Sequence, residues 1–310
     1  MDQRPPASAY AAAVGMTLAF ALSFVATKTA LKGFEPLLIA LLRFTLAGAI
    51  LFVVWRLRPV REPVTRRELG RLALVGFVSL TVYFSFENSG IARTSASEAA
   101  ILIATIPIFT AVIGAFLPAE RPTGRQWAGI LLSFAGIVGL VLAAGGAGGG
   151  SLTGDLLVLT ASVSGAAYAI LARRLLVSRS ALYVTAFQNL FGALFIAPLA
   201  LVEALVAGVR RPTVPAAGGV LFLTLVCSIL AYLLLNYAFR FLPASRVSVF
   251  INLTPVVAVA SAYLILGERL TLAQGAAAIV VVAGVWVTNS GRRCGAGGVG
   301  EPELRSPSAG

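Results

Sequence analysis

Long stretches without a single charged residue divide this chain into repeated apolar segments. A transmembrane helix needs about 20 mostly apolar residues, and most of the ten stretches reach that length unaided. The second stretch reaches it if Arg43 is included, and the third if Glu87 is included. Their apolar residues are continuous instead of alternating with a period of two, which favours helices over the strands of a membrane β-barrel. The ten stretches are Pro5–Thr27, Phe44–Trp55, Leu72–Phe86, Ala99–Ala119, Gln126–Gly154, Leu156–Ala172, Ala181–Val202, Pro212–Phe239, Val247–Gly267 and Leu270–Gly291.

The composition is typical of a protein that is surrounded by lipid. Charged residues make up 12% of the chain and hydrophobic residues 58%, with a mean hydropathy of +0.92. Soluble domains carry about 25% charged residues, so this chain has too few charges to cover a surface that faces water. We therefore expect an all-α integral membrane protein with ten transmembrane helices and the lipid bilayer as its surroundings.

The basic residues are distributed unevenly between the segments that join these helices. If the N-terminus lies in the cytoplasm and the helices alternate in direction, 17 of the 24 Lys and Arg residues fall on the cytoplasmic side and six on the other, with Arg43 inside a helix. This bias follows the positive-inside rule and places the N- and C-termini in the cytoplasm. It also accounts for the net charge of +12 without a basic face for nucleic acid. We expect a multi-pass protein of the cell inner (plasma) membrane that binds no nucleic acid.

A shift of the chain by 148 residues brings a second copy of the same pattern into register. Between residues 94–139 and 242–287, 11 of 46 positions are identical without a gap. Each copy holds five of the predicted helices, and an odd number makes the second copy enter the membrane from the opposite side. We predict two inverted five-helix repeats, residues 10–144 and 154–291, with disordered cytoplasmic tails at residues 1–9 and 292–310.

The identical positions include a Glu-Arg-x-Thr phrase at Glu120–Thr123 that returns at Glu268–Thr271. Thr123 and Thr271 can each cap the helix that follows. The Glu and Arg residues before them end the preceding helix at the membrane interface. Because the two copies lie on opposite membrane faces, no single substrate site could use both, and we interpret the phrase as structural.

With these features the chain resembles the drug/metabolite transporter superfamily, of the EamA type. The resemblance covers about residues 10–290 and implies a secondary transporter of small metabolites, often an exporter, without implying one particular substrate. Its phrases, in chain order, are FVATKTAL (Phe24–Leu31), LLRF (Leu41–Phe44), NSGIARTSASEAAILIATIPIFTAVIGAFLPAERPT (Asn88–Thr123), GDLLVLTASVSGAAYAILARRL (Gly154–Leu175) and NYAFRFLPASRVSVFINLTPVVAVASAYLILGERLT (Asn236–Thr271).

Two ionisable residues fall inside the predicted helices. Such groups are costly in a membrane and usually face a cavity or a partner. Arg43 lies about seven residues into the second helix, roughly 10 Å below its outer boundary, and Glu87 lies near the outer end of the third. They could form a structural ion pair that locks these helices together. Alternatively, Arg43 could meet an anionic substrate group while Glu87 meets a cation or a proton, and a titrating Glu87 would provide proton coupling.

Polar residues on the third, seventh and eighth helices complete the candidate substrate site. Gln188 and Asn189 in the seventh helix are the counterpart of Arg43 in the second copy. Ser79, Tyr83 and Glu87 in the third helix are spaced i, i+4, i+8, and so are Ser228, Tyr232 and Asn236 in the eighth, which places each trio on one helix face. Such stripes either hold helices together or line a cavity. The candidate substrate-binding residues are Arg43, Tyr83, Glu87, Gln188, Asn189, Tyr232 and Asn236.

Pro107 and Pro255 fall at equivalent positions in the middle of the fourth and ninth predicted helices. A proline removes one backbone hydrogen bond and kinks a helix. The two kinks are candidate gates, and the alternative is that they only fix the shape of the helices.

Several classes of function are disfavoured by the residue types. The chain contains no His, which removes His-dependent metal sites and Ser-His catalysis. It also lacks a Gly-x-x-x-x-Gly-Lys-Ser/Thr phrase, so the chain alone would not drive transport with ATP. We expect no enzyme activity, no metal and no cofactor apart from a coupling proton.

The sequence thus predicts a secondary transporter that moves small molecules, namely amino acids or related compounds and drugs, by alternating access, as an exporter. A homodimer is an open option. Two alternatives remain. A passive facilitator or channel-like uniporter is the first, and a channel would show neither counterflow nor saturation. A lipid-linked sugar translocase is the second, and it would need a laterally open groove.

Overall fold

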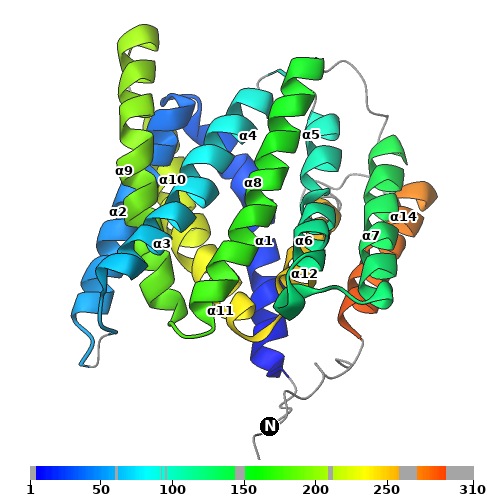
Figure 1. Cartoon of the computed structure of the whole chain (residues 1–310). Coiled ribbons are helices and arrows are strands. Elements are labelled where there is room, and N and C mark those ends of the chain that lie inside the picture. The colour runs from blue at the N-terminus through cyan, green and yellow to red at the C-terminus, as the bar shows by residue number, and fades with distance from the viewer. Residues whose placement is uncertain are drawn as a thin grey trace, which may run out of the picture.

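The computed structural model describes residues 5–59, 62–91, 93–94, 96–143, 151–208, 212–257 and 271–290, and its regular elements there are helices (Figure 1). Residues 1–4 and 292–310 of the predicted tails and most of the second Glu-Arg-x-Thr phrase lie outside these residues, whereas residues 7–9 of the predicted N-terminal tail are helical. The elements are α1 Ala7–Ala30, α2 Pro36–Arg56, α3 Arg66–Gly76, the π-helix η1 Phe77–Val82, α4 Tyr83–Ile91, α5 Ala96–Ile103, α6 Ile106–Ala115, the 3₁₀-helix η2 Pro118–Glu120, α7 Gly124–Ala143, α8 Leu152–Leu176, α9 Ala181–Ala207, α10 Val214–Phe222, the π-helix η3 Leu223–Ala231, α11 Tyr232–Phe241, α12 Ala244–Ser248, the 3₁₀-helix η4 Val249–Asn252 and α14 Leu272–Asn289.

In the described part of the chain, seven helices are long and apolar enough to cross a membrane. Three shorter apolar helices, Ala7–Ser23, Ile101–Ala115 and Ala244–Val257, add to them among the described residues. The seven are Pro36–Arg56, Arg66–Gly90, Gly124–Ala143, Leu152–Leu176, Ala181–Val206, Val214–Phe241 and Leu272–Asn289. The prediction of a helical membrane protein is therefore confirmed, while ten membrane crossings and the inverted relation of the two halves stay predictions.

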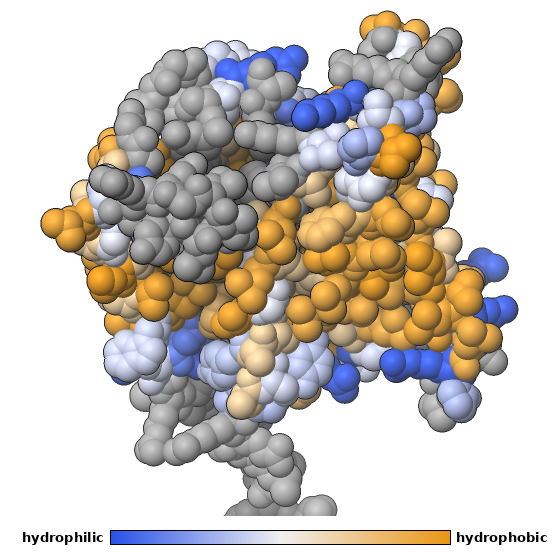
Figure 2. Space-filling view, turned by 180° about the vertical axis from the view of Figure 1, so that it is seen from behind, coloured by the Kyte–Doolittle hydropathy of each residue, from blue (hydrophilic) through white to orange (hydrophobic). Residues whose placement is uncertain are grey.

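The outer surface of the bundle is apolar and its interior holds the polar side chains. On α2, Leu46, Ile50 and Val53 are exposed, whereas Arg43 on the same helix is buried. Figure 2 shows the corresponding apolar band across one face, with hydrophilic residues above and below it. This is the reverse of a soluble protein, and it is the arrangement that a lipid environment favours.

The fourth predicted helix is broken in two instead of being merely kinked. α5 ends at Ile103 and α6 begins at Ile106, with Pro107 in the first turn of α6. A proline ring collides with the carbonyl group four residues earlier, which here belongs to Ile103. The ninth predicted helix is interrupted at the equivalent place, because the 3₁₀-helix η4 separates α12 from the residues around Pro255.

The third and eighth predicted helices share another irregularity. Each runs as an α-helix, then as a π-helix, and then as an α-helix again. The π-helical segments are η1 and η3, and both lie directly before site candidates, Tyr83 and Tyr232. Short π-helical segments are rare and are found mostly at functional sites.

The helices α7 and α14 form a close pair on one side of the bundle (Figure 1). A Cβ atom added to Gly284 of α14 would lie 2.7 Å from the carbonyl oxygen of Gly129 in α7. Such contact requires a residue without a side chain on both helices, because small residues let two backbones approach in a membrane.

Both helices of this pair begin with the capping arrangement that the repeated phrase predicts. The Gln126 backbone N–H donates to the Thr123 hydroxyl (3.3 Å), and the Thr123 N–H donates back to the Gln126 side chain (2.7 Å). Thr271 and Gln274 make the same two hydrogen bonds at 3.2 and 3.0 Å. The capping role of both threonines is therefore confirmed, with Gln in the place that a capping box requires.

Candidate functional site

The guanidinium group of Arg43 is buried and is held by one hydrogen bond and two aromatic rings. Its Nε–H donates to the hydroxyl oxygen of Ser228 in η3 at 2.8 Å. The aromatic rings of Phe44 and Phe84 each lie 4.9 Å from the guanidinium carbon. The residue is only 6% exposed. Ser228 and the two rings therefore hold a cation in place without neutralising it.

The two Nη atoms at the end of this guanidinium are available to a ligand. Its two Nη atoms have no hydrogen-bond partner among the described residues. They are also not among the fully buried polar atoms that lack a partner in that part of the chain, so they keep some contact with solvent. A guanidinium edge with two parallel N–H donors matches the two oxygens of a carboxylate. The arrangement can therefore receive one carboxylate group end-on.

Glu87 lies near Arg43 but does not form an ion pair with it. Glu87 accepts a hydrogen bond from the Tyr83 hydroxyl one turn earlier in α4, at 2.9 Å. The described ion pairs within 4.0 Å are Arg173–Glu120 and Arg179–Glu68. Glu87 is nevertheless close enough to Arg43 for their charges to interact. The structure thus lacks the direct Arg43–Glu87 ion pair that the first interpretation of the sequence required to lock the two helices together.

A network of neutral polar groups lies deeper along the same bundle. Asn236 of α11 accepts a hydrogen bond from the Tyr168 hydroxyl of α8 at 2.9 Å. Its amide group donates to the hydroxyl of Thr185 and to the side-chain oxygen of Gln188, both in α9, at 2.8 and 3.2 Å. Asn236 thus ties three helices together. We call Asn236, Tyr168, Thr185 and Gln188 the polar floor.

Two buried atoms in and beside the polar floor have no partner among the residues that the structure describes. They are the Gln188 Nε2 donor and the Asn189 Oδ1 acceptor, although the Asn189 amide group donates to the Thr185 carbonyl at 2.9 Å. An unpaired buried polar atom costs about 1–3 kcal/mol. A ligand or an ordered water molecule that pairs with these atoms would recover this cost, so they favour a binding site over a purely structural network.

Tyr232 lies between the Arg43 group and the polar floor. Its ring packs edge-on against Phe20 of α1, with centroids 5.9 Å apart, and against Tyr168 at 6.1 Å. Its hydroxyl has no hydrogen-bond partner among the described residues and is not sealed from solvent. Rings from α1, α2, α4 and α11 therefore surround the polar groups with apolar surface.

The break between α5 and α6 lies beside this site. A Cβ atom added to Gly165 of α8 would lie 3.3 Å from both Ile106 and Tyr83. At the break the Leu102 carbonyl accepts from the backbone N–H of Thr105 at 3.1 Å. The hydroxyl groups of Ser162 and Thr105 also donate to it, at 2.8 and 2.5 Å. Broken helices whose backbone groups are satisfied in this way often flank the binding sites of transporters. Pro107 and Pro255 stay predicted gates.

The predicted site residues form two groups: Arg43, Tyr83 and Glu87 lie near one another, and Tyr232 connects them to Gln188 and Asn236 of the polar floor. The described hydrogen bond of Asn189 stays within α9, and that of Ser79 joins it to the Val75 carbonyl at 2.6 Å. Tyr168, Thr185 and Phe84 were not predicted from the sequence. Thr185, Gln188 and Asn189 are spaced i, i+3, i+4 in a spanning helix, and this pattern could have revealed Thr185. Tyr168 and Phe84 carry no such signal.

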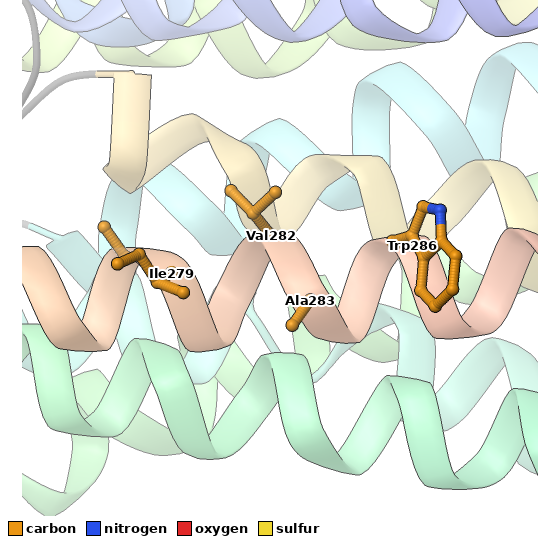
Figure 3. Close-up of a pocket in the computed structure, with 5 residues that line it drawn as sticks. Ile279, Val282, Ala283 and Trp286 are labelled. Carbon is orange, nitrogen blue, oxygen red and sulfur yellow. The ribbon is translucent and has the colours of Figure 1, made fainter.

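A hollow of about 500 Å³ lies elsewhere, on the outer face of α14 (Figure 3). Its lining is apolar and comes from that helix alone, namely Ala278, Ile279, Val282, Ala283 and Trp286. Trp286 is 66% exposed. This surface offers no group that could orient a polar ligand, so we place the candidate site at Arg43 and the polar floor.

The chain matches the EamA-like transporter family over residues 7–142 and again over residues 152–290. An uncharacterized transporter of Bacillus subtilis is 30% identical over 91% of this chain and 92% of the relative. A Streptantibioticus cattleyicolor protein named probable terminal-alkyne amino-acid exporter is 30% identical (87% and 89%). A Salmonella typhimurium protein named probable amino-acid metabolite efflux pump is 29% identical (90% and 93%). A solved crystal structure with 22% identity superposes with a TM-score of 0.75 over 91% of this chain and 96% of that one, which shows the fold.

Proposed function

The chain belongs to the EamA-like transporter family, and on this premise we propose that it is a secondary transporter that exports small metabolites by alternating access. The substrate site is the region between Arg43 and the polar floor. Its substrates are amino acids or related compounds that carry a carboxylate group. Its relatives include proteins named probable terminal-alkyne amino-acid exporter and probable amino-acid metabolite efflux pump, at 30% and 29% identity.

The observation that carries this proposal is the open edge of Arg43. A buried guanidinium without a carboxylate partner is costly in a membrane. Here Ser228, Phe44 and Phe84 hold the group and leave the two Nη atoms unpaired among the described residues. A substrate carboxylate supplies the missing partner, whereas a side chain that only locked two helices would have its partner within the protein.

Glu87 is the proposed partner for the positive end of the substrate. It faces the same region as Arg43, and its Oε2 atom has no hydrogen-bond partner among the described residues while keeping some contact with solvent. A carboxylate can meet a substrate ammonium group or take up a proton. In the absence of substrate, proton binding at Glu87 would couple export to the proton gradient.

The aromatic rings of the site favour substrates with an apolar side chain. Phe20, Phe44, Phe84 and Tyr232 surround the charged groups, and aromatic surfaces bind apolar and aromatic groups. We therefore choose L-phenylalanine as the first probe, because it combines a carboxylate, an ammonium group and an aromatic ring.

The two halves of the chain, residues 10–144 and 154–291, are proposed to be inverted repeats that alternate between two conformations around this site. In support, the two halves share broken helices, π-helical segments and capping boxes at corresponding places. We further propose that both termini lie in the cytoplasm and that the protein resides in the plasma membrane, as the positive-inside bias favours. A homodimer remains a prediction.

Thermal-shift measurements on the detergent-purified protein test this function. The panel contains amino acids, nucleosides, sugars and cationic drugs, with wild type, Arg43→Ala and the exposed-surface control Arg240→Ala. A ligand of the native state stabilises it by about 2.7 kcal/mol at 100 times its Kd. We expect L-phenylalanine to raise the melting temperature of wild type and of Arg240→Ala, but not of Arg43→Ala.

A response to L-phenylalanine that is equal in all three proteins would contradict the proposed site. A response to sugars alone would favour the sugar-translocase alternative.

A further inference from the structure

A second pair of buried charges lies outside the proposed substrate site. Arg173 of α8 donates from Nε to a carboxylate oxygen of Glu120 in η2 at 2.5 Å. The two residues are 9% and 8% exposed. The substrate site does not use either residue. The Glu-Arg-x-Thr phrase predicts an interfacial position for Glu120, and it does not predict that Glu120 is buried against Arg173.

Further hydrogen bonds extend this pair to four elements. The other carboxylate oxygen of Glu120 accepts from the backbone N–H of Ala244, the first residue of α12, at 2.8 Å. The Arg173 Nη1 donates to the carbonyl of Phe239 in α11 at 2.5 Å. Glu120 belongs to the first half of the chain, and Arg173, Phe239 and Ala244 to the second. The pair is therefore a polar connection between the two halves.

The Glu120–Arg173 connection lies close to the polar floor, further along α8 and α11. Asn236 of the floor and Phe239 are three residues apart in α11, about 4.5 Å along the helix. Tyr168 of the floor and Arg173 are five residues apart in α8, about 7.5 Å. The rings of Tyr168 and Phe239 pack between them with centroids 6.0 Å apart.

The end of the bundle where this connection lies is the one that carries the N-terminus. The loop from α6 to α7, the end of α8 and the end of α11 all lie at the lower end in Figure 1, as the N-terminus does. Ser228, which holds Arg43, lies about two turns further up the helix that contains Asn236. The charged site, the polar floor and the buried pair thus follow one another toward the N-terminal end of the bundle.

A buried ion pair is a suitable reversible connection. The cost of removing both charges from water offsets most of their attraction, so the pair adds little net stability, and breaking it in a dry interior is nevertheless strongly unfavourable. Water that enters on opening can solvate both charges and lower that cost. We propose that Glu120 and Arg173 form a latch that closes the path between the polar floor and the N-terminal end of the bundle. This inference rests on the proposed alternating access.

A merely structural role is the competing explanation, and the chain offers a matched control. Arg179 and Glu68 form another Arg–Glu pair, with Nε–Oε1 at 2.5 Å and Nη2–Oε2 at 2.8 Å. That pair connects α3 to the segment between α8 and α9, and it does not border the polar floor. A variant that removes its charge should therefore leave the path closed.

Cysteine accessibility tests the latch without knowledge of the substrate. The reporter is Ala169→Cys in the full chain with Cys227→Ala and Cys294→Ala. Ala169 is 2% exposed and lies one turn from Arg173 on the same face of α8. Proteoliposomes are treated with a charged, membrane-impermeant maleimide, and the rate of modification is measured. Glu120→Gln should raise the rate at least about tenfold, which corresponds to about 1.4 kcal/mol, whereas Glu68→Gln should leave it unchanged.

A second reporter separates opening from general loosening. Ala47→Cys is fully buried on α2, and its rate should stay constant in every variant. The double variant Glu120→Gln/Arg173→Gln leaves no unpaired buried charge, so it should fold and should also accelerate modification of Cys at position 169. An unchanged rate at position 169, or equal acceleration at both reporters, would overturn the latch. Failure of the proposed substrate to bind would leave these rates unaffected, so the two failures are distinguishable.

Discussion

The Nε–H of Arg43 donates to the hydroxyl oxygen of Ser228 at 2.8 Å, across 185 residues of sequence. Arg43 lies in the first half of the chain and Ser228 in the second. Movement of the halves against each other would therefore change how the guanidinium is held. In this account one hydrogen bond couples substrate binding to the conformation of the bundle.

Removal of the Ser228 hydroxyl should weaken substrate binding without unfolding the protein. Hydrogen bonds to charged groups contribute about 1.5–3 kcal/mol, so Ser228→Ala should raise the KM for L-phenylalanine by at least about tenfold. Transport kinetics in proteoliposomes measure this. The effect should disappear in an Arg43→Lys background, because lysine has no Nε–H of this geometry for Ser228 to accept. An equal effect in both backgrounds would show that Ser228 does not act through Arg43.

Asn236→Ala should destabilise the protein strongly. The change leaves the Tyr168 hydroxyl and the side chains of Thr185 and Gln188 without their shared partner. Each unpaired buried group costs about 1–3 kcal/mol. The melting temperature in detergent measures the loss. Asn289→Ala is the matched control, since that amide makes one hydrogen bond to a carbonyl in its own helix. Similar melting temperatures for the two variants would contradict the polar floor.

Alanine at Gly284 should separate α7 from α14. The new Cβ atom would lie 2.7 Å from the Gly129 carbonyl oxygen and closer still to the Ser133 backbone nitrogen. Overpacking of this kind costs about 1–3 kcal/mol. Gly275→Ala on the same helix meets no atom within 4 Å, and alanine favours helix formation by up to about 1 kcal/mol. Thermal unfolding should therefore place Gly284→Ala below wild type and Gly275→Ala at or above it.

Glu62 should make stability depend on pH in the acid range. Burial alone would raise the pKa of this carboxyl, but hydrogen bonds from Ser180, and a weaker one from Trp55, lower its pKa below the ordinary value of 4.5. Because the pKa of Glu62 is lower in the folded than in the unfolded protein, Glu62 contributes its full stabilisation above the unfolded pKa. That contribution is lost as the pH falls through the folded pKa. The melting-temperature difference between wild type and Glu62→Gln should be constant from pH 7 to about pH 5 and then shrink. A difference that grows toward low pH would contradict this sign.

The membrane class and the helical order could be predicted from the sequence because each depends on simple counting. Long uncharged runs reveal spanning helices, and the aligned threonines reveal both caps. The buried Arg43 was recognisable because a charge inside such a run is exceptional. In each of these cases the residue type and its immediate sequence neighbours are enough to predict the structure.

The remaining features depend on spatial neighbours that the sequence does not reveal. The spacing i, i+4, i+8 did not reveal that Ser79 lies in the π-helix η1 and donates to the Val75 carbonyl of its own span. Glu120 directly follows an uncharged stretch, so the sequence predicts an interfacial residue. Nothing in its local sequence shows that Arg173 contacts it. Tyr168 resembles any aromatic residue of an apolar helix until Asn236 is placed opposite its hydroxyl.

Exchange of L-phenylalanine across proteoliposome membranes tests the central claim most directly. Vesicles loaded with unlabelled L-phenylalanine receive external radiolabelled L-phenylalanine, with or without excess L-phenylalaninamide, which lacks the carboxylate. The account predicts counterflow by wild type that unlabelled L-phenylalanine inhibits and the amide does not, and no counterflow by folded Arg43→Ala. Counterflow by Arg43→Ala with an unchanged KM, or equal inhibition by the amide, would contradict the claim that Arg43 binds the carboxylate of the substrate.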